Sequence, residues 1–236
     1  MKRSTWIAFV PFYLLVAIIF LGISTGGSRA VTAINQQRPV EREHAIVIDA
    51  GHGGIDGGAT SCTGVLESQI NLEIALRLED FLHFLGYKTV MIRRVDESIY
   101  TQGNTIAAQK ISDLNERVRI VNDTEDAILV SIHQNTFSNS RYKGAQVFYA
   151  PTEGSQKLAQ QLQADFVSCL NPGSNRKAKK ADNIYLLQNI KCPGVLIECG
   201  FLTNPQEEAM LRSKDYQLKL CTVIASACSR YLEEKQ

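Results

Sequence analysis

The sequence predicts a single α/β domain with a mostly parallel central sheet flanked by helices, preceded by an N-terminal hydrophobic segment. Three observations predict this fold class. Short apolar runs rich in β-branched residues alternate with longer segments whose apolar residues recur at helical spacing. The 236 residues are 44% hydrophobic and 21% charged, which is typical of a globular protein with one well-formed core. An uncharged, mostly apolar run over residues 6–23 stands apart from this alternation.

Residues 1–30 are predicted to direct export, as a signal peptide or a membrane anchor. Lys2 and Arg3 precede the apolar run, and Ser28–Ala30 offers small residues where a signal peptidase could cut. Because the run is long for a signal core, we favour an uncleaved anchor. The basic start stays inside and the remainder is exported. The polar residues 31–43 are predicted to form a linker to a catalytic domain over 44–236.

The first half of the domain contains two predicted strands and two predicted helices. Residues 45–48 are apolar and β-branched, so we expect a buried strand. Residues 67–85 show helical spacing and end at a glycine, which predicts a helix, and residues 87–92 form the next strand. The polar residues 95–112 are expected to form a surface loop before a short helix at 113–122.

The second half continues the alternation of strands and helices. Apolar runs predict strands over 127–132, 145–149, 184–187 and 194–197. Helical spacing predicts helices over 155–170 and 215–232, the first of them broken by an Asn-Pro-Gly turn. In the last helix Cys221 and Cys228 share a face and are expected to be small core residues.

A glycine-rich loop follows the first strand. Five of the eight residues from Gly51 to Gly58 are glycines, and His52 lies among them. Open α/β sheets build their sites just beyond the carboxyl ends of strands, where His52 is predicted to lie. The glycines match no phosphate-binding motif. The net charge of +1 gives no support for a nucleic-acid partner.

Three candidate metal ligands are expected at one edge of the sheet. His52 and His133 each follow a predicted strand, and Glu67 begins the first long helix. Two imidazoles and one carboxylate are the donor set of hydrolytic zinc sites. Taken singly, each has an ordinary explanation: a hydrogen-bonding histidine at a strand end, or a carboxylate that complements a helix dipole. Their convergence favours a metal site.

Glu198 is a fourth candidate, because it follows the apolar run 194–197. Apolar neighbours would raise its pKa toward neutrality, which suits a general acid or base. The competing interpretation makes it a buried partner for a cation such as Arg93 or Arg117.

With these four residues and the motifs around them, the chain resembles the zinc-dependent N-acetylmuramoyl-L-alanine amidases (amidase type 3). The matching positions occur in family order across the domain: Ile48–Ala59, Glu67, Asn71, Leu72, Ala75, Arg93, Asp96, Leu114, Arg117, Asn122, Ser131–Asn135 and Leu196–Asn204. Two small departures are Ala50, where proline is commoner, and Cys199. Neither departure affects a ligand position.

The resemblance implies one zinc ion per domain, with His52, Glu67 and His133 as its ligands. It implies that Glu198 is the catalytic acid and base. The reaction would be hydrolysis of the amide bond between N-acetylmuramic acid and L-alanine in peptidoglycan. Asp49, Asn135 and Arg93 are weaker candidates, for orienting ligands or binding substrate; for Asp49 and Asn135, turn stabilisation is an equally good explanation.

One domain behind an apolar segment is similar to the spore-cortex, or germination-specific, amidases of endospore formers. That similarity implies action in the forespore intermembrane space, a membrane or lipoprotein partner, and a downstream deacetylase that completes muramic-δ-lactam. The basic run Arg176–Lys180 is either solvated or grips anionic peptide stems or a partner. Two alternatives remain: a zinc peptidase that cuts within the peptide stem, and a non-catalytic wall-binding protein with a relic site.

Overall fold

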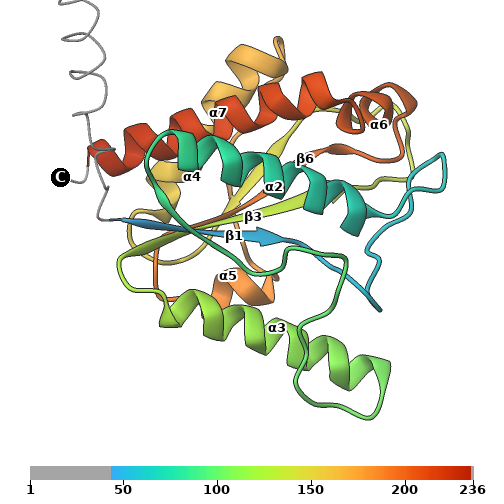
Figure 1. Cartoon of the computed structure of the whole chain (residues 1–236). Helices are drawn as coiled ribbons and strands as arrows, with labels where there is room; N and C mark the ends of the chain where they lie inside the picture. Colours follow the sequence, from blue (N-terminus) through green and yellow to red (C-terminus); the bar gives the residue numbers. More distant parts are fainter. Residues whose placement is uncertain (1–43, 235–236) are drawn as a thin grey trace, which may run out of the picture. The chain divides into compact units, whose positions relative to one another are not determined.

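The computed structural model describes residues 44–234. Within them, six strands form one sheet in the order β2-β1-β3-β6-β4-β5 (Figure 1). The strands are β1 (Ala45–Ala50), β2 (Lys88–Met91), β3 (Ala127–Asn135), β4 (Gln146–Tyr149), β5 (Lys179–Lys180) and β6 (Gly194–Phe201).

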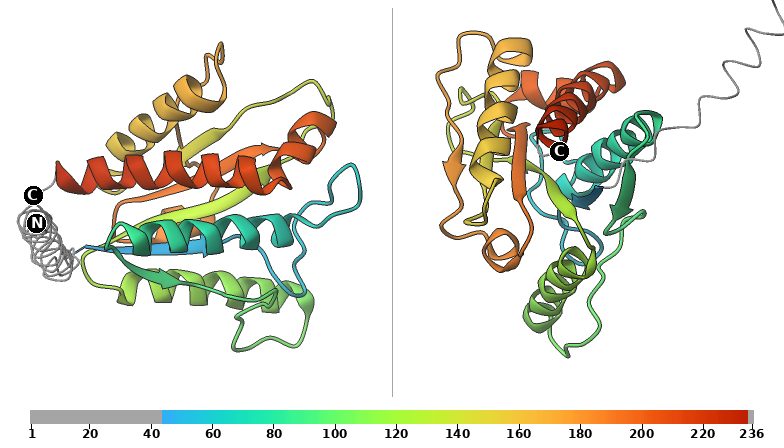
Figure 2. Two further views of the ribbon diagram at one scale, coloured as in Figure 1. Left: turned by 45° about the horizontal axis from the view of Figure 1, so that its top comes forward. Right: turned by 90° about the vertical axis from the view of Figure 1, so that its left-hand side faces the viewer.

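Helices cover both faces of this sheet. They are α2 (Glu67–Phe84), α3 (Ile106–Asp123), α4 (Ser155–Asp165) with the π-helical turn η1 (Phe166–Leu170), α5 (Tyr185–Asn189), α6 (Pro205–Leu211) and α7 (Lys214–Glu233). As Figures 1 and 2 show, α2, α4 and α7 lie on one face, and α3 and α5 lie on the other.

The sheet is mostly parallel, which confirms the predicted fold class. β1 runs parallel to β2 and β3, and β3 runs parallel to β6. β4 is antiparallel to β6, and β5 follows the direction of β4. The carboxyl ends of β1, β3 and β6 therefore meet at one edge, where a short chain segment from each can contribute to a common site.

The central strands β1, β3 and β6 each contain a buried apolar run because helices cover both of their faces. All six residues of β1 are buried. Ile48 and Val130 face the layer of α2 and α7, whereas Val47 and Leu129 face α3 and α5. Cys221 and Cys228 are buried in α7, as their shared helical face predicted.

Two predicted elements differ from the structure. The strand predicted over 184–187 is wrong, because Tyr185–Asn189 forms the short helix α5. Leu186 and Leu187 are buried against the sheet and add no strand to it. A four-residue apolar run fits either a strand or a buried helical turn, and local pattern does not decide between them. The helix predicted over 113–122 begins earlier, where the Thr105 side chain accepts a hydrogen bond from the Ala108 backbone N–H.

Two strands continue beyond their predicted ends. β3 extends to Asn135 and β6 to Phe201, so His133 and Glu198 lie within strands and do not follow them. The pairing of β3 with β6 shifts register between His133 and Asn135. The two-residue β5 falls inside the predicted basic loop at 176–180.

The predicted export segment and linker lie outside the described residues. From 44 to 234, no helix combines the length and the apolar character needed to cross a bilayer.

Candidate active site

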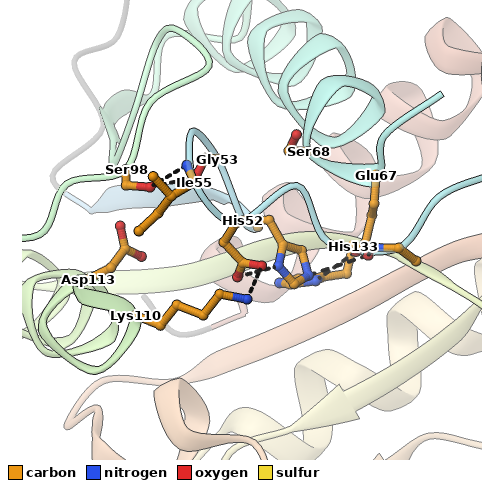
Figure 3. Close-up of polar contacts among 12 residues, drawn as sticks. His52, Gly53, Ile55, Glu67, Ser68, Ser98, Lys110, Asp113 and His133 are labelled. Carbon is orange, nitrogen blue, oxygen red and sulfur yellow. Dashed lines mark hydrogen bonds and ion pairs between the residues drawn. The ribbon is translucent and has the colours of Figure 1, made fainter. Parts of the chain in front are cut away.

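Three metal-ligating side chains converge at the carboxyl edge of the sheet. His52 follows β1, His133 lies near the end of β3, and Glu67 is the first residue of α2. His52 Nε2 lies 3.4 Å from Glu67 Oε2, and His133 Nδ1 lies 3.1 Å from Glu67 Oε1. One donor atom from each residue fits within 4.8 Å of the others. Figure 3 shows both imidazoles next to this carboxylate.

His52 is oriented by a residue of its own loop. Its Nδ1 lies 2.8 Å from Asp56 Oδ2, and Asp56 Oδ1 accepts a hydrogen bond from Lys110 at 2.7 Å. Burial alone would lower the pKa of His52, but its hydrogen bonds to Glu67 and Asp56 raise it to about 9. The Asp56 contact leaves Nε2 directed at Glu67, which is the arrangement that orients histidine ligands in metal sites.

Glycine is required where the loop passes the ligands. A Cβ atom on Gly51 would lie 2.2 Å from His133 Nε2, so only glycine permits this packing. Gly58 has φ +68°, and a Cβ there would lie 2.7 Å from Glu67 Oε2. The loop glycines thus bring backbone close to the ligand side chains.

Glu67 is held by hydrogen bonds to both carboxylate oxygens. The backbone N–H groups of Ala59 and Gln134 donate at 3.0 and 3.1 Å, and the Asn71 amide donates at 3.3 Å. Burial opposes ionisation, yet the hydrogen bonds and charges of His133 and His52 hold the pKa of Glu67 far below its ordinary value. Glu67 is therefore an anion whose geometry is defined before any metal binds.

Glu198 faces the same site from β6. It pairs with His133 across the β3–β6 ladder, and it lines a cavity of about 420 Å³ with both histidines. Its Oε2 atom is buried and has no hydrogen-bond partner among the described residues. Burial, aided by the nearby Glu67 charge, raises the pKa of Glu198 to about 7.

The predicted alternative for Glu198, a buried ion pair with Arg93 or Arg117, is wrong. Arg117 contacts Asp49 and Asp113 instead, and it also donates to the carbonyl oxygen of His52 at 2.8 Å. Asp49 further accepts a hydrogen bond from the Ser131 hydroxyl at 2.6 Å. Asp49 therefore ties β1, β3 and α3 together beneath the site.

Arg93 holds the histidine loop from below. It is 2% exposed, and its guanidinium donates to the carbonyl oxygens of Ala50, Gly51 and Ser68 at 2.8 to 3.0 Å. These contacts fit a role in supporting the site, and a role for Arg93 in binding substrate stays a prediction. Asn135 ends β3, and its carbonyl oxygen accepts a hydrogen bond from the Leu202 N–H. A role for its side chain stays a prediction.

Sequence reasoning missed Asp56 and Lys110. A carboxylate four residues after His52 in a glycine loop is a signal for Asp56, although the loop geometry is needed to interpret it. Lys110 lies 54 residues from Asp56 on α3, in a segment predicted to be a loop. Figure 3 shows Lys110 reaching toward the His52 loop from α3.

The donor set fits zinc. Two imidazoles and one carboxylate with an adjacent acidic group match the donor set of hydrolytic zinc sites.

Comparison with known proteins agrees with this geometry. The family model described as N-acetylmuramoyl-L-alanine amidase matches residues 46–230. The germination-specific N-acetylmuramoyl-L-alanine amidase of Bacillus subtilis strain 168 is 33% identical over 237 residues, which cover 99% of this chain and 97% of that protein.

Two solved structures share the fold. The CwlD amidase from Clostridioides difficile, solved in complex with the GerS lipoprotein, has a TM-score of 0.77 and 36% identity, and the match covers 80% of this chain and 98% of that one. The N-acetylmuramoyl-L-alanine amidase from Clostridium difficile 630 has a TM-score of 0.71 and 32% identity over 82% of this chain and 98% of that one.

Proposed function

Because the chain belongs to the N-acetylmuramoyl-L-alanine amidase family, we propose that it is a zinc enzyme that strips peptide stems from N-acetylmuramic acid in the spore cortex. Family membership establishes an amidase that acts on peptidoglycan. The zinc ion, the roles of the residues and the cortex as substrate are the proposal. The observation that carries it is the half-buried Glu198, whose Oε2 has no hydrogen-bond partner among the described residues, next to the cluster of His52, Glu67 and His133.

His52, Glu67 and His133 would hold the zinc ion. When bound, zinc would supply Lewis-acid polarisation of the scissile carbonyl and lower the pKa of a coordinated water to about 7. The three side chains are preorganised for this role, since Asp56 orients His52 and four hydrogen bonds fix Glu67. Little rearrangement is then needed on binding.

Glu198 would carry the proton between the two halves of the reaction. As a carboxylate it accepts a proton from the attacking water, and as a carboxylic acid it gives that proton to the leaving amine nitrogen of L-alanine. A pKa of about 7 suits both directions at neutral pH. Glu198 lines the same cavity as both histidines, which puts its side chain where the substrate would enter.

The cortex setting is supported by the printed names of relatives. The Bacillus subtilis protein is called germination-specific, and the CwlD amidase was solved with a lipoprotein. By analogy, we propose that this chain is exported to the forespore intermembrane space and binds a lipoprotein partner there. A deacetylase would then act on the stripped muramic acid to allow δ-lactam formation.

The test is digestion of purified cortex and vegetative peptidoglycan with added zinc, followed by mass spectrometry of the products. New N-terminal L-alanine and intact muramic acid lactyl groups are expected. Cuts within the peptide stem would instead identify a peptidase, and binding without cleavage would identify a wall-binding protein.

His133→Ala is the matched control for the metal. Loss of one of three protein ligands should lower zinc affinity and activity together. Unchanged zinc stoichiometry and affinity in this variant would refute the ligand assignment.

A further inference from the structure

A second cavity opens beside the catalytic one and has a basic lining. It measures about 800 Å³, nearly twice the catalytic cavity of about 420 Å³. Its walls are the β3–β4 connection, the loop that follows η1, and α6. Figure 1 shows α6 at the end of the molecule toward which β1 points, so this cavity and the catalytic residues share one edge of the domain.

Three cations line this groove: Arg141, Lys143 and Arg176. Glu207 is the one acidic residue among the described residues that line it. Its carboxylate is 4% exposed and accepts hydrogen bonds from the backbone N–H groups of Gly144 and Phe201, at 2.8 and 2.9 Å. Three cations against one carboxylate leave the groove with an excess of positive charge.

Arg176 is fixed in place at the groove wall. Its guanidinium lies 5.2 Å from the centre of the Phe201 ring, and it donates to Gln146 Oε1 and to the Lys143 carbonyl oxygen, each at 3.3 Å. A guanidinium held this way loses less conformational freedom when it binds an anion. Asn171 joins two walls of the groove by accepting a hydrogen bond from Ala145 N–H at 3.0 Å.

The groove is linked to the catalytic residues through two strands. Phe201 lies three residues after Glu198 in β6, a separation of about 10 Å at the usual rise of a strand. Gln146, which contacts Arg176, is the direct partner of Glu198 across the β4–β6 ladder. The groove wall at Phe201 therefore lies about 10 Å along β6 from Glu198, a distance that one extended polymer can span.

We propose that this groove binds a second, carboxylate-bearing peptide stem of the same peptidoglycan polymer, through Arg141, Lys143 and Arg176. The proposal rests on the proposed function. Peptide stems of peptidoglycan carry free carboxylates, which guanidinium and ammonium groups recognise. The protein should then bind the polymer more tightly than isolated fragments. Of the predicted basic run Arg176–Lys180, only Arg176 takes part in this binding.

The test uses the full chain in a mild detergent, with a chelator present to stop hydrolysis. The groove variant carries Arg141→Gln and Lys143→Gln, and the control carries Lys179→Gln and Lys180→Gln. The control removes the same charge from exposed residues that do not line the groove. Binding to insoluble peptidoglycan should weaken roughly five- to tenfold in the groove variant and stay unchanged in the control. Arg141→Glu with Lys143→Glu should weaken it further.

Carboxylate recognition is tested with peptidoglycan whose stem carboxylates have been amidated. Wild type should bind it as weakly as the groove variant does. Equal binding of amidated and native wall, or equal loss in the control, would overturn the proposal. Normal wall binding with loss of a protein partner would also overturn it, in favour of a protein-docking surface.

Cleavage of a soluble muropeptide with a single stem separates this inference from the proposed function. With zinc restored, wild type and groove variant should cleave it equally, while KM for the polymer rises in the variant. No cleavage by wild type would refute the proposed function. If wild type and the groove variant cleave the muropeptide equally and also bind the polymer equally, the groove proposal is refuted and the proposed function stands.

Discussion

At the residue scale, Glu198 is the carboxylate of the candidate site whose environment favours its protonated form. It is half-buried, and its buried Oε2 atom has no hydrogen-bond partner among the described residues, next to the anionic Glu67 and two histidines. Burying a carboxylate oxygen without a partner is costly, so its presence calls for a functional explanation. Two predictions follow from this environment, one for turnover and one for stability.

The first prediction concerns Glu198→Gln, which should keep zinc bound while nearly abolishing hydrolysis. Glutamine has the size of glutamate but cannot accept and return a proton. General acid–base catalysis contributes roughly 10²- to 10⁴-fold, and we expect the upper end because one group serves both halves of the reaction. Turnover and zinc content are measured on the same sample. Near-wild-type turnover at full zinc occupancy would remove Glu198 from the mechanism.

The second prediction is that Glu198→Gln stabilises the metal-free protein at alkaline pH. The pKa of Glu198 rises from 4.5 to about 7 on folding, so the native state binds this proton more tightly than the unfolded state. The free energy of unfolding of wild type therefore falls between pH 4.5 and 7 by an amount on the order of 3 kcal/mol. The Glu198→Gln variant has no carboxylate at this position, so its free energy of unfolding should not fall in this way.

Chelator-treated samples melted at pH 5 and pH 8 provide the measurement. The matched control is Glu208→Gln. Burial opposes ionisation of Glu208, but hydrogen bonds from Thr63, Arg212 and Ser61 hold its pKa below the ordinary value, so its loss should destabilise the protein at both pH values. A lower melting temperature for Glu198→Gln at pH 8 would show that the carboxylate stabilises the fold.

At the scale of elements, the packing of α3 against β1 supports the histidine loop. Arg117 of α3 is 3% exposed and contacts the buried Asp49 of β1, and it also donates to the carbonyl oxygen of His52. Burial disfavours the charged form of Asp49, but Arg117 and a hydrogen bond from Ser131 keep its pKa below the ordinary value. The helix position and the loop position are thus coupled through one side chain.

The third prediction is that Arg117→Met destabilises the domain by about 3–5 kcal/mol, since it leaves a buried carboxylate unpaired. Urea denaturation measures this loss. Adding Asp49→Asn should recover part of the stability. Arg119→Met, on the exposed side of the same helix, is the control and should change little. Equal losses for the two arginines would contradict a special role for the buried pair.

The fourth prediction concerns the turn after β1. Gly51→Ala would place a Cβ atom 2.2 Å from the His133 ring, so the imidazole must move out of line with Glu67. Zinc affinity should fall at least tenfold, as it does when supporting contacts of a metal site are lost. Gly64→Ala is the control, because nothing lies within 4 Å of its Cβ and only backbone strain at φ +91° is added. Unchanged zinc affinity in Gly51→Ala would show that His133 tolerates the shift.

At the scale of the whole molecule, parallel pairing brings residues that are distant in sequence to one edge. β1, β3 and β6 each end there, so His52, His133 and Glu198 meet although 146 residues, the difference between positions 52 and 198, separate the first from the last. The two apolar layers of the core lie on either side of these strands and fix their register.

The fifth prediction is that a chain beginning at Arg38 folds without the export segment. Residues 44–234 contain both apolar layers that cover the sheet. We expect a soluble protein that unfolds in one cooperative thermal transition. Aggregation, or a broad transition with exposed apolar surface, would mean that residues 6–23 belong to the core.

The sequence by itself determined the fold class and four residues of the candidate site. Buried parallel strands are continuously apolar and the glycine loop has a distinct composition, so local pattern was enough to place His52, Glu67, His133 and Glu198 at one edge. The family motifs determined the type of reaction in the same way.

Only the tertiary structure decided the identity of α5, the partners of the buried charges, and the basic groove. Residues 185–189 form a helix that buries Leu186 and Leu187 in the core and adds no strand to the sheet. Three contacts join residues that lie 25 to 68 positions apart in the sequence. They are the ion pairs Arg117–Asp49 and Lys110–Asp56 and the contact of Arg176 with the Phe201 ring. Such contacts depend on how helices pack on the sheet, which local sequence pattern does not predict.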